Sequence, residues 1–319
     1  MQRSACSLVI PVFNGSKYLS KSISGIVQMA GQNDEILIIN DGSTDVDMNY
    51  WSQLQAIDSR INVIHKNHEG IVSALNTGFA QAKNLFIARM DVDDSCKPER
   101  IDLQIKEIIR NPDVGVVFCD YEFVDLNSKD RLGSIPTAVF SNASLLSMVN
   151  PQRMPHPGAL ISKEKFLEVG GYSTQDSPCE DYGLWLRIAE KYSIVSVPEI
   201  LLEYSISPKS LTSLNAEEMS TRVDKLRNLI LPSILERVSD REVVDDFLNY
   251  GSLSNGIDRQ ILLFRDLMIL LFKKIRIYRI STYLRLAAHL FLHSGRVIIA
   301  VKDIRSSQIA RRNTRLQLR

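Results

Sequence analysis

Short apolar runs alternate with amphipathic segments along roughly the first two hundred residues of this 319-residue chain. The runs at 7–13, 35–39 and 85–90 are short and largely apolar, which is typical of buried strands. Between them, residues 72–79 and 103–109 carry apolar side chains at helical spacing. This alternation predicts an α/β fold, with a Rossmann-like, mostly parallel sheet flanked by helices.

Polar side chains follow each of these three runs at the point where it ends. The first run closes at Asn14, the second at Asn40 and Asp41, and the third at a cluster of acids over 91–94. Because the carboxyl ends of parallel strands line the ligand crevice of an open α/β sheet, we expect these side chains to share one edge.

The third run ends in three carboxylates, Asp91, Asp93 and Asp94. Acids this close raise one another's pKa unless a cation offsets their charge. Their oxygen atoms suit a hard divalent ion, Mg²⁺ or Mn²⁺. The alternative is a solvated loop whose acids cap the helix expected after Pro98, and this segment alone leaves both interpretations open.

Four segments in a fixed order resemble the motifs of the family 2 glycosyltransferases, the inverting group with the A-type nucleotide-sugar fold. They are Val9-Ile-Pro-Val-Phe-Asn14, Asn40-Asp-Gly-Ser-Thr-Asp45, Asp91-Val-Asp93-Asp94 and Ser177-Pro-Cys-Glu-Asp-Tyr-Gly-Leu-Trp-Leu-Arg187. The resemblance covers about residues 5 to 205. It implies a nucleotide-sugar-binding catalytic domain over residues 1–210.

The resemblance also implies roles for single residues of a donor pocket. Asp41 would accept a hydrogen bond from the nucleotide base, although an Asx turn before Gly42 would explain the same residue. Asp91 and Asp93 would hold the ribose and the metal, whereas Asp94 could simply cap the next helix. The remaining donor-pocket candidates are Pro11, Phe13, Asn14, Gly70 and Asn76.

Inverting transfer needs one carboxylate that takes the proton of the acceptor hydroxyl, and Asp181, beside Glu180, is the candidate base. A base bound to the metal would have too low a pKa, so an acid from another segment is expected. The alternative is that both acids favour the N-terminus of a helix over 182–192 through its dipole. The two interpretations are compatible.

One position departs from the family pattern. Family members often carry an Arg-Asn pair in the helix after a glycine near position 70, and here Leu75 stands at the arginine position. Our hypothesis is that Arg89 supplies the missing charge, by pairing with diphosphate or by orienting a carboxylate.

On the acceptor side, residues 154–161 and 166–172 also resemble the family. They make His156 a candidate to face the acceptor, although a histidine between prolines is often a turn residue. Trp185, also placed on the acceptor side, is on balance a core aromatic of its helix.

Other chemistries lack their motifs. The chain has no Gly-x-Gly and no Gly-x-x-x-x-Gly-Lys sequence, so a dinucleotide fingerprint and a phosphate loop are not expected. Its four cysteines show no paired spacing, which indicates reduced cytosolic thiols rather than disulfides or zinc. The short run before Pro11 does not resemble a secretory signal, so we expect a cytoplasmic enzyme.

Charge is distributed unevenly along the chain. Residues 273–319 hold 12 Lys or Arg and one acid, a net charge of +11, against −10 for the remainder. Together with aliphatic runs from residue 261 onward, this predicts a linker near 205–216 and a helical, basic amphipathic region over 217–319. Residues 261–319 would suit the anionic inner face of a membrane; packing on the catalytic domain and a homodimer interface stay open. Nucleic acid is not expected, because aliphatic residues separate the charges.

The function expected from this resemblance is metal-assisted, inverting transfer of a sugar from a nucleoside diphosphate sugar to a glycan or lipid-linked acceptor. UDP is favoured only because the resemblance most often implies it. One alternative is a non-catalytic scaffold that binds sugar nucleotides or glycans. Another, a nucleotidyltransferase, lacks the basic, glycine-rich loop that it would need.

Overall fold

The computed structural model describes residues 3–135, 154–206 and 216–237. All of these belong to one compact unit, Met1–Arg237. A second unit, Val238–Arg319, contains most of the basic region and lies outside the described residues, so the expectations for 261–319 are not tested. Within the described part of the chain, no helix is both long enough and apolar enough to cross a membrane.

The N-terminal half has the predicted alternation of strands and helices. Four parallel strands lie in the order β3-β2-β1-β4. The strands are β1 (Cys6–Val12), β2 (Glu35–Asp41), β3 (Ile61–Lys66) and β4 (Phe86–Arg89), connected by α1 (Ser16–Met29), α2 (Met48–Ile57) and α3 (Ile71–Gln81). Each residue of β1 is buried, as expected for a strand that is covered on both faces.

The second half makes the sheet mixed. Across the described strands the order continues as β8-β6-β9-β5, with β7 paired to β6. These strands are β5 (Ser95–Cys96), β6 (Val114–Asp125), β7 (Arg131–Ile135), β8 (Leu160–Ser162) and β9 (Ser193–Ile206). The short strand β8 is antiparallel to both β4 and β6, whereas β6 and β9 are parallel. The α/β class is confirmed, and the parallel part of the sheet is chiefly the motif-bearing N-terminal half.

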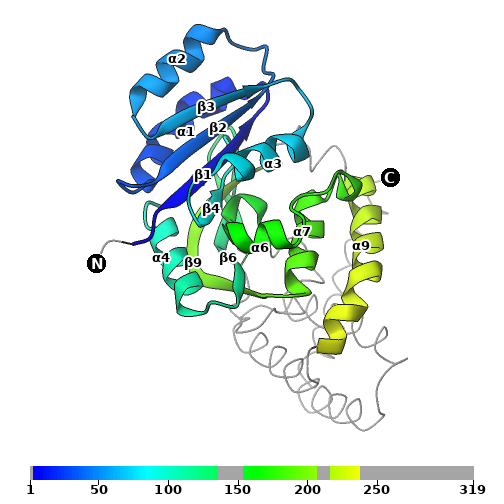
Figure 1. Ribbon diagram of the computed structural model, residues 1–319. Coiled ribbons are helices and arrows are strands. Elements are labelled where there is room, and N and C mark those ends of the chain that lie inside the picture. Colours follow the sequence, from blue (N-terminus) through cyan, green and yellow to red (C-terminus); the bar gives the residue numbers. More distant parts are fainter. Residues whose placement is uncertain (1–2, 136–153, 207–215, 238–319) are drawn as a thin grey trace, which may run out of the picture. The chain divides into compact units, whose positions relative to one another are not determined.

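Helices cover both faces of this sheet. Leu8 and Ile10 of β1 belong to one apolar cluster with residues of α1, α2 and α4 (Arg100–Arg110). Val9 points to the other face, where α3 approaches so closely that a Cβ on Gly78 would lie 2.4 Å from the Val9 side chain. Beyond them lie α6 (Lys163–Glu168), α7 (Glu180–Ala189) and α9 (Ala216–Arg237). The last two helices run side by side (Figure 1), and the Cys179 thiol bonds to the backbone oxygen of Met219 at 3.5 Å.

Two buried polar side chains of α4 hold the seam where the sheet changes direction. Arg100 donates to the backbone oxygens of Arg89 and Ala159, at 3.0 and 3.1 Å. Gln104 donates to the backbone oxygens of Val117 and Gly158, at 2.9 and 2.7 Å. Buried polar groups are tolerated when they are hydrogen-bonded in this way. The hydrogen bond from Arg100 therefore holds the end of β4, from which the acidic loop continues.

Candidate functional site

The acidic loop after β4 brings three carboxylates together. One oxygen from each of Asp91, Asp93 and Asp94 lies within 4.8 Å of the others. Burial and the charge of Asp91 raise the pKa of Asp93 to about 6. Burial, with the charges of Asp91 and Asp93, raises the pKa of Asp94 well above its usual range. A divalent cation would offset this repulsion, and the all-oxygen donor set fits Mg²⁺ or Mn²⁺.

Asp94 also has a structural task. Its Oδ1 accepts a hydrogen bond from the backbone N–H of Ser205 at 2.8 Å, and the Ser205 hydroxyl donates to the backbone oxygen of Asp93 at 2.6 Å. The alternative that Asp94 caps the next helix is wrong, because Glu99 occupies the N-cap of α4 and makes no side-chain cap bond. Asp94 ties the loop to β9, and Asp91 and Asp93 are the less buried acids of the three.

Arg89 orients one of these acids. It is 4% exposed, and its Nη1 pairs with Oδ2 of Asp91 at 2.5 Å. Its Nε has no hydrogen-bond partner within the described structure. Of the two tasks considered for Arg89, the structure shows the pairing with a carboxylate. Leu75 is fully buried in the core and offers no polar contact at its position.

The two acids of the fourth motif lie in the first turn of α7. Burial and the charge of Glu180 raise the pKa of Asp181 to about 7, while burial raises the pKa of Glu180 as well. The Arg89 charge opposes these shifts for both acids, as it does for Asp93. Arg89 therefore shares one electrostatic neighbourhood with the acidic loop and with the start of α7. The N-terminal position expected from the helix dipole is observed too, so both interpretations of these acids hold together.

The acceptor-side candidates are both buried. His156 bonds through Nε2 to the Tyr172 hydroxyl at 2.9 Å, and burial lowers its pKa well below the usual range, so its ring is neutral. Trp185 is 1% exposed and packs edge-on against Phe118 and His156. Its Nε1 lacks a hydrogen-bond partner in the described part of the chain. Trp185 is thus a core aromatic, and His156 supports the Tyr172 side of the neighbourhood around Arg89.

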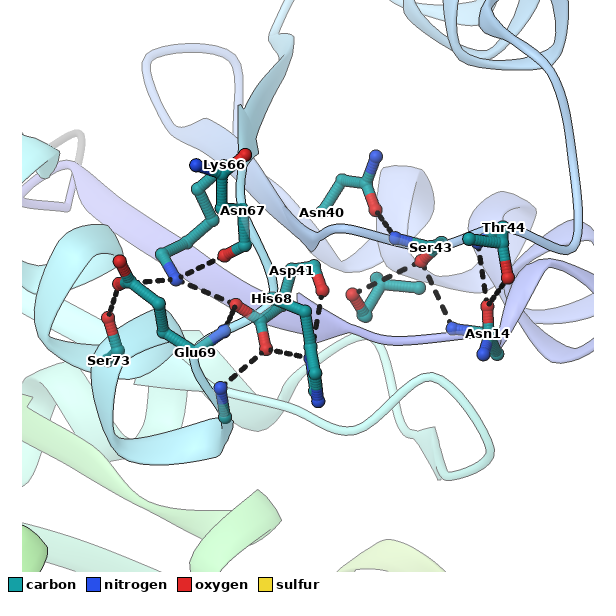
Figure 2. Close-up of polar contacts among 12 residues, drawn as sticks. Asn14, Asn40, Asp41, Ser43, Thr44, Lys66, Asn67, His68, Glu69 and Ser73 are labelled. Carbon is teal, nitrogen blue, oxygen red and sulfur yellow. Dashed lines mark hydrogen bonds and ion pairs between the residues drawn. The ribbon is translucent and has the colours of Figure 1, made fainter.

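At the end of β2, Asp41 is surrounded by donors (Figure 2). Its Oδ1 accepts from Lys66 Nζ at 2.7 Å and from the Glu69 N–H at 3.1 Å. Its Oδ2 contacts Nδ1 of His68 at 2.8 Å and accepts from the Gly70 N–H at 2.9 Å. Burial alone would raise the pKa of Asp41, but the hydrogen bonds from Lys66 and the two backbone groups outweigh it and lower the pKa.

The remaining donor-pocket candidates lie in β1, directly after it, and in α3. Asn14 has a left-handed backbone, with φ of 51°, and its Oδ1 accepts from the Thr44 N–H at 2.8 Å, which joins the ends of β1 and β2. Phe13 is half exposed, whereas Pro11 is buried inside β1. Asn76 is already engaged, because its amide makes two hydrogen bonds with the backbone of Tyr172, at 2.9 and 3.1 Å.

A cavity of about 690 Å³ adjoins the acidic loop on the α1 side. Asp93 and Asp94 line it together with α1 and with residues 124–131, which include the end of β6 and the start of β7. Lys17, Lys21 and Lys129 supply positive charge to its walls. There is consequently open space beside the Asp93 carboxylate.

The family model described as Glycosyl transferase family 2 matches residues 7–169, about half of the chain. The chain belongs to glycosyl transferase family 2. It is therefore a glycosyltransferase, as the four motifs indicated, and the matched range includes the first three of them.

Relatives agree with this membership but differ in length. An uncharacterized glycosyltransferase of Haemophilus influenzae is 24% identical over 241 residues, which cover 73% of this chain and 75% of that protein. An uncharacterized glycosyltransferase of Rickettsia felis is 27% identical over 70% of this chain but only 37% of its own length. The amylovoran biosynthesis glycosyltransferase AmsE of Erwinia amylovora is 28% identical, over 62% of this chain and 74% of its own.

Solved structures show the same fold. S. aureus TarS 1-349 in complex with UDP aligns with a TM-score of 0.57 and 16% identity, over 79% of this chain and 74% of TarS 1-349. The mannosyltransferase PcManGT from Pyrobaculum calidifontis, in complex with GDP-Man and Mn²⁺, aligns with a TM-score of 0.54 and 14% identity, over 92% and 81% of the two chains. Identities this low show the fold alone, which is the expected glycosyltransferase A type.

The sequence motifs do not point to Lys66 and His68, two residues that contact Asp41. Polar side chains at a strand end would have indicated them, because Lys66 is the last residue of β3 and His68 follows two residues later. The run 61–66 was not recognised as a strand, since it contains Asn62, His65 and Lys66 among its apolar residues.

Proposed function

We propose that this glycosyltransferase transfers a sugar, with inversion, from a nucleoside diphosphate sugar to a glycan or lipid-linked acceptor, assisted by Mg²⁺ or Mn²⁺. The observation that carries the proposal is the half-buried Asp181 carboxylate in the first turn of α7. Its pKa is raised to about 7, and the Arg89 charge acts both on it and on the acidic loop. A base with a pKa near the working pH is the most effective one.

In this proposal Asp91 and Asp93 hold the divalent ion, and Arg89 keeps the Asp91 carboxylate in place. The ion, when bound, stabilises the negative charge that develops on the leaving diphosphate. Solved structures of other proteins support a nucleotide donor and a divalent ion. TarS was solved with UDP and with UDP-GlcNAc, and PcManGT with GDP-Man and Mn²⁺. A UDP-sugar remains the favoured donor.

Asp181 acts as the base of a single displacement. It takes the proton of an acceptor hydroxyl while that oxygen bonds to the anomeric carbon, and the bond from that carbon to the diphosphate oxygen breaks. No covalent intermediate with the protein forms, so the configuration at the anomeric carbon inverts. Glu180 assists indirectly, because its charge helps to raise the pKa of Asp181.

Replacing Asp181 by Asn tests this role. The variant should bind donor as the unmodified protein does, and lose transfer by about 10²- to 10⁴-fold, the usual contribution of general base catalysis. Glu164→Gln is the matched control, because Glu164 is an exposed acid in the first turn of α6, away from the proposed site. Transfer that survives in Asp181→Asn would remove Asp181 as the base. If no member of a nucleotide-sugar panel is consumed by the unmodified protein, the binding scaffold becomes the better explanation.

For the acceptor we propose only a chemical class, and for the cellular position a contact with the membrane. The name of the relative AmsE, a biosynthetic enzyme for amylovoran, supports a polysaccharide or its lipid-linked precursor as acceptor. We propose that residues 1–210 form the catalytic domain and 217–319 a helical, basic amphipathic region, of which residues 261–319 contact the anionic inner face of the membrane. Sedimentation with anionic liposomes at low and high salt tests this contact. The full chain should pellet only at low salt, and failure to pellet there would rule the contact out.

A further inference from the structure

The rings of His68 and Phe13 are stacked beside Asp41. Their centroids are 3.8 Å apart and their planes differ by 14°. The same imidazole places Nδ1 2.8 Å from Oδ2 of Asp41. One planar, nitrogen-containing ring thus has an aromatic face beneath it and a carboxylate at its edge. A nucleobase in the proposed donor pocket would use the same two contacts.

The proton on this imidazole can be assigned from its partners. Nδ1 lies 2.8 Å from the Asp41 carboxylate and 3.1 Å from the Asp41 backbone oxygen. Both are acceptors, so Nδ1 is the ring nitrogen that carries the proton. His68 therefore presents an N–H to Asp41, as the imide group of a pyrimidine base would.

Asp41 has no acceptor site to spare for a base. Each of its two oxygens already has two partners, which matches the roughly four lone-pair sites of a carboxylate. Two of those partners are backbone groups of the turn that begins α3. The exchangeable donors are the side chains of Lys66 and His68, and only His68 also covers the face of Phe13.

The backbone at this position is held, while the ring is open to solvent. Gly42 has φ of +73°, and a Cβ there would lie 2.7 Å from the backbone nitrogen of His68. The lack of a side chain at Gly42 therefore allows the two backbone segments to touch. The His68 side chain is 51% exposed, so its ring can rotate away without moving that backbone.

We propose that His68 occupies the nucleobase position of the donor pocket and lowers the affinity for the donor by competing with its base. This inference rests on the proposed function. A base that carries a ring N–H, such as uracil or guanine, replaces both contacts of the imidazole and displaces it. Cytosine presents a ring acceptor to the carboxylate instead, so CDP should bind more weakly than UDP both with and without the His68 side chain.

Calorimetric titration of the full chain with UDP and with CDP, in the presence of Mg²⁺, tests this competition in the unmodified protein and in His68→Ala. Affinity is reduced by the fraction of time that a site is blocked. If His68 leaves the nucleobase position free for between about a third and a tenth of the time, removing its side chain restores the full affinity. We therefore expect His68→Ala to bind UDP about three- to tenfold more tightly. Asn67→Ala, which changes the exposed neighbour, is the matched control and should leave UDP affinity unchanged.

The outcomes separate the two proposals. Equal or weaker UDP binding by His68→Ala overturns the competition but leaves the proposed function standing. If neither protein binds UDP, CDP or any member of the nucleotide-sugar panel, the inference and the proposed function are overturned together. A second measurement follows the NMR signal of the His68 ring, assigned by its loss in the Ala variant. Saturating UDP should move this signal as the ring leaves Phe13, and a signal that stays in place overturns the proposal.

Discussion

Two strand ends in this glycosyltransferase place carboxylates in opposite electrostatic states. At the end of β2, Asp41 is surrounded by donors that lower its pKa. After β4, burial and then the charge of Asp91 raise the pKa of Asp93 to about 6. The position after a strand end is similar, and the neighbours differ. A carboxylate whose hydrogen-bond donors belong to the protein stabilises the fold. Neighbouring carboxylates without such donors repel each other, and a cation from solution would offset that repulsion.

The sign of the pH dependence follows from this difference. Asp41, with a lowered pKa, contributes stability that is present above its unfolded pKa and is lost as the pH falls. Asp93 and Asp181, with raised pKa values, contribute stability that is present below their unfolded pKa, near 4. That contribution is lost as the pH rises through about 6 and about 7. Near neutral pH the ionised carboxylates of Asp93 and Asp181 therefore lower the stability of the fold.

Among variants at the two strand ends, Asp93→Asn should have the largest effect, which is on transfer. Loss of one ligand charge should weaken binding of the divalent ion and reduce transfer by at least about 100-fold. The same change removes repulsion within the loop, so the metal-free variant should resist urea better than the unmodified protein. Transfer assays and urea unfolding in EDTA measure the two effects. Lower stability of the variant in EDTA would show that the loop is not strained without its ion.

The pH profile of transfer should be altered by Glu180→Gln. Transfer in the unmodified protein should increase with pH through about 7, as Asp181 loses its proton. The charge of Glu180 contributes to raising this pKa, so the variant should reach its maximum at lower pH. Rate measurements from pH 5 to 9, with donor saturating, would show the displacement. An unchanged profile would mean that another group limits the acid side.

Asp41→Asn should have the opposite effect on stability from Asp93→Asn. An amide in this position cannot accept from all four donors and carries no charge for Lys66, so unfolding should require about 2 kcal/mol less. Urea unfolding in EDTA places the two variants on one scale. If both substitutions changed stability in the same direction, the contrast between the two strand ends would be wrong.

The sequence predicted more of the proposed catalytic site than of the proposed donor pocket, for a physical reason. Apolar runs followed by polar side chains predicted β1, β2 and β4, because burial on both faces leaves an uninterrupted apolar run. β3 was missed since its solvent-facing positions, such as Asn62 and His65, interrupt that pattern. Contacts between distant segments, such as that of Asn76 with Tyr172, depend on packing and leave no periodic signal. The tie between Asp94 and Ser205 is of the same kind.

The smallest expected effect comes from Trp185→Phe, which tests whether this residue belongs to the acceptor side. The indole is buried and its Nε1 has no hydrogen-bond partner within the described residues, so phenylalanine removes an unsatisfied donor. That gain should offset part of the volume lost, and stability should change by no more than about 1 kcal/mol. Transfer should stay within about twofold, because a core aromatic of α7 contacts no substrate. Measured KM for the acceptor is the decisive quantity, since a severalfold increase without a change in unfolding would place the indole in the acceptor pocket after all.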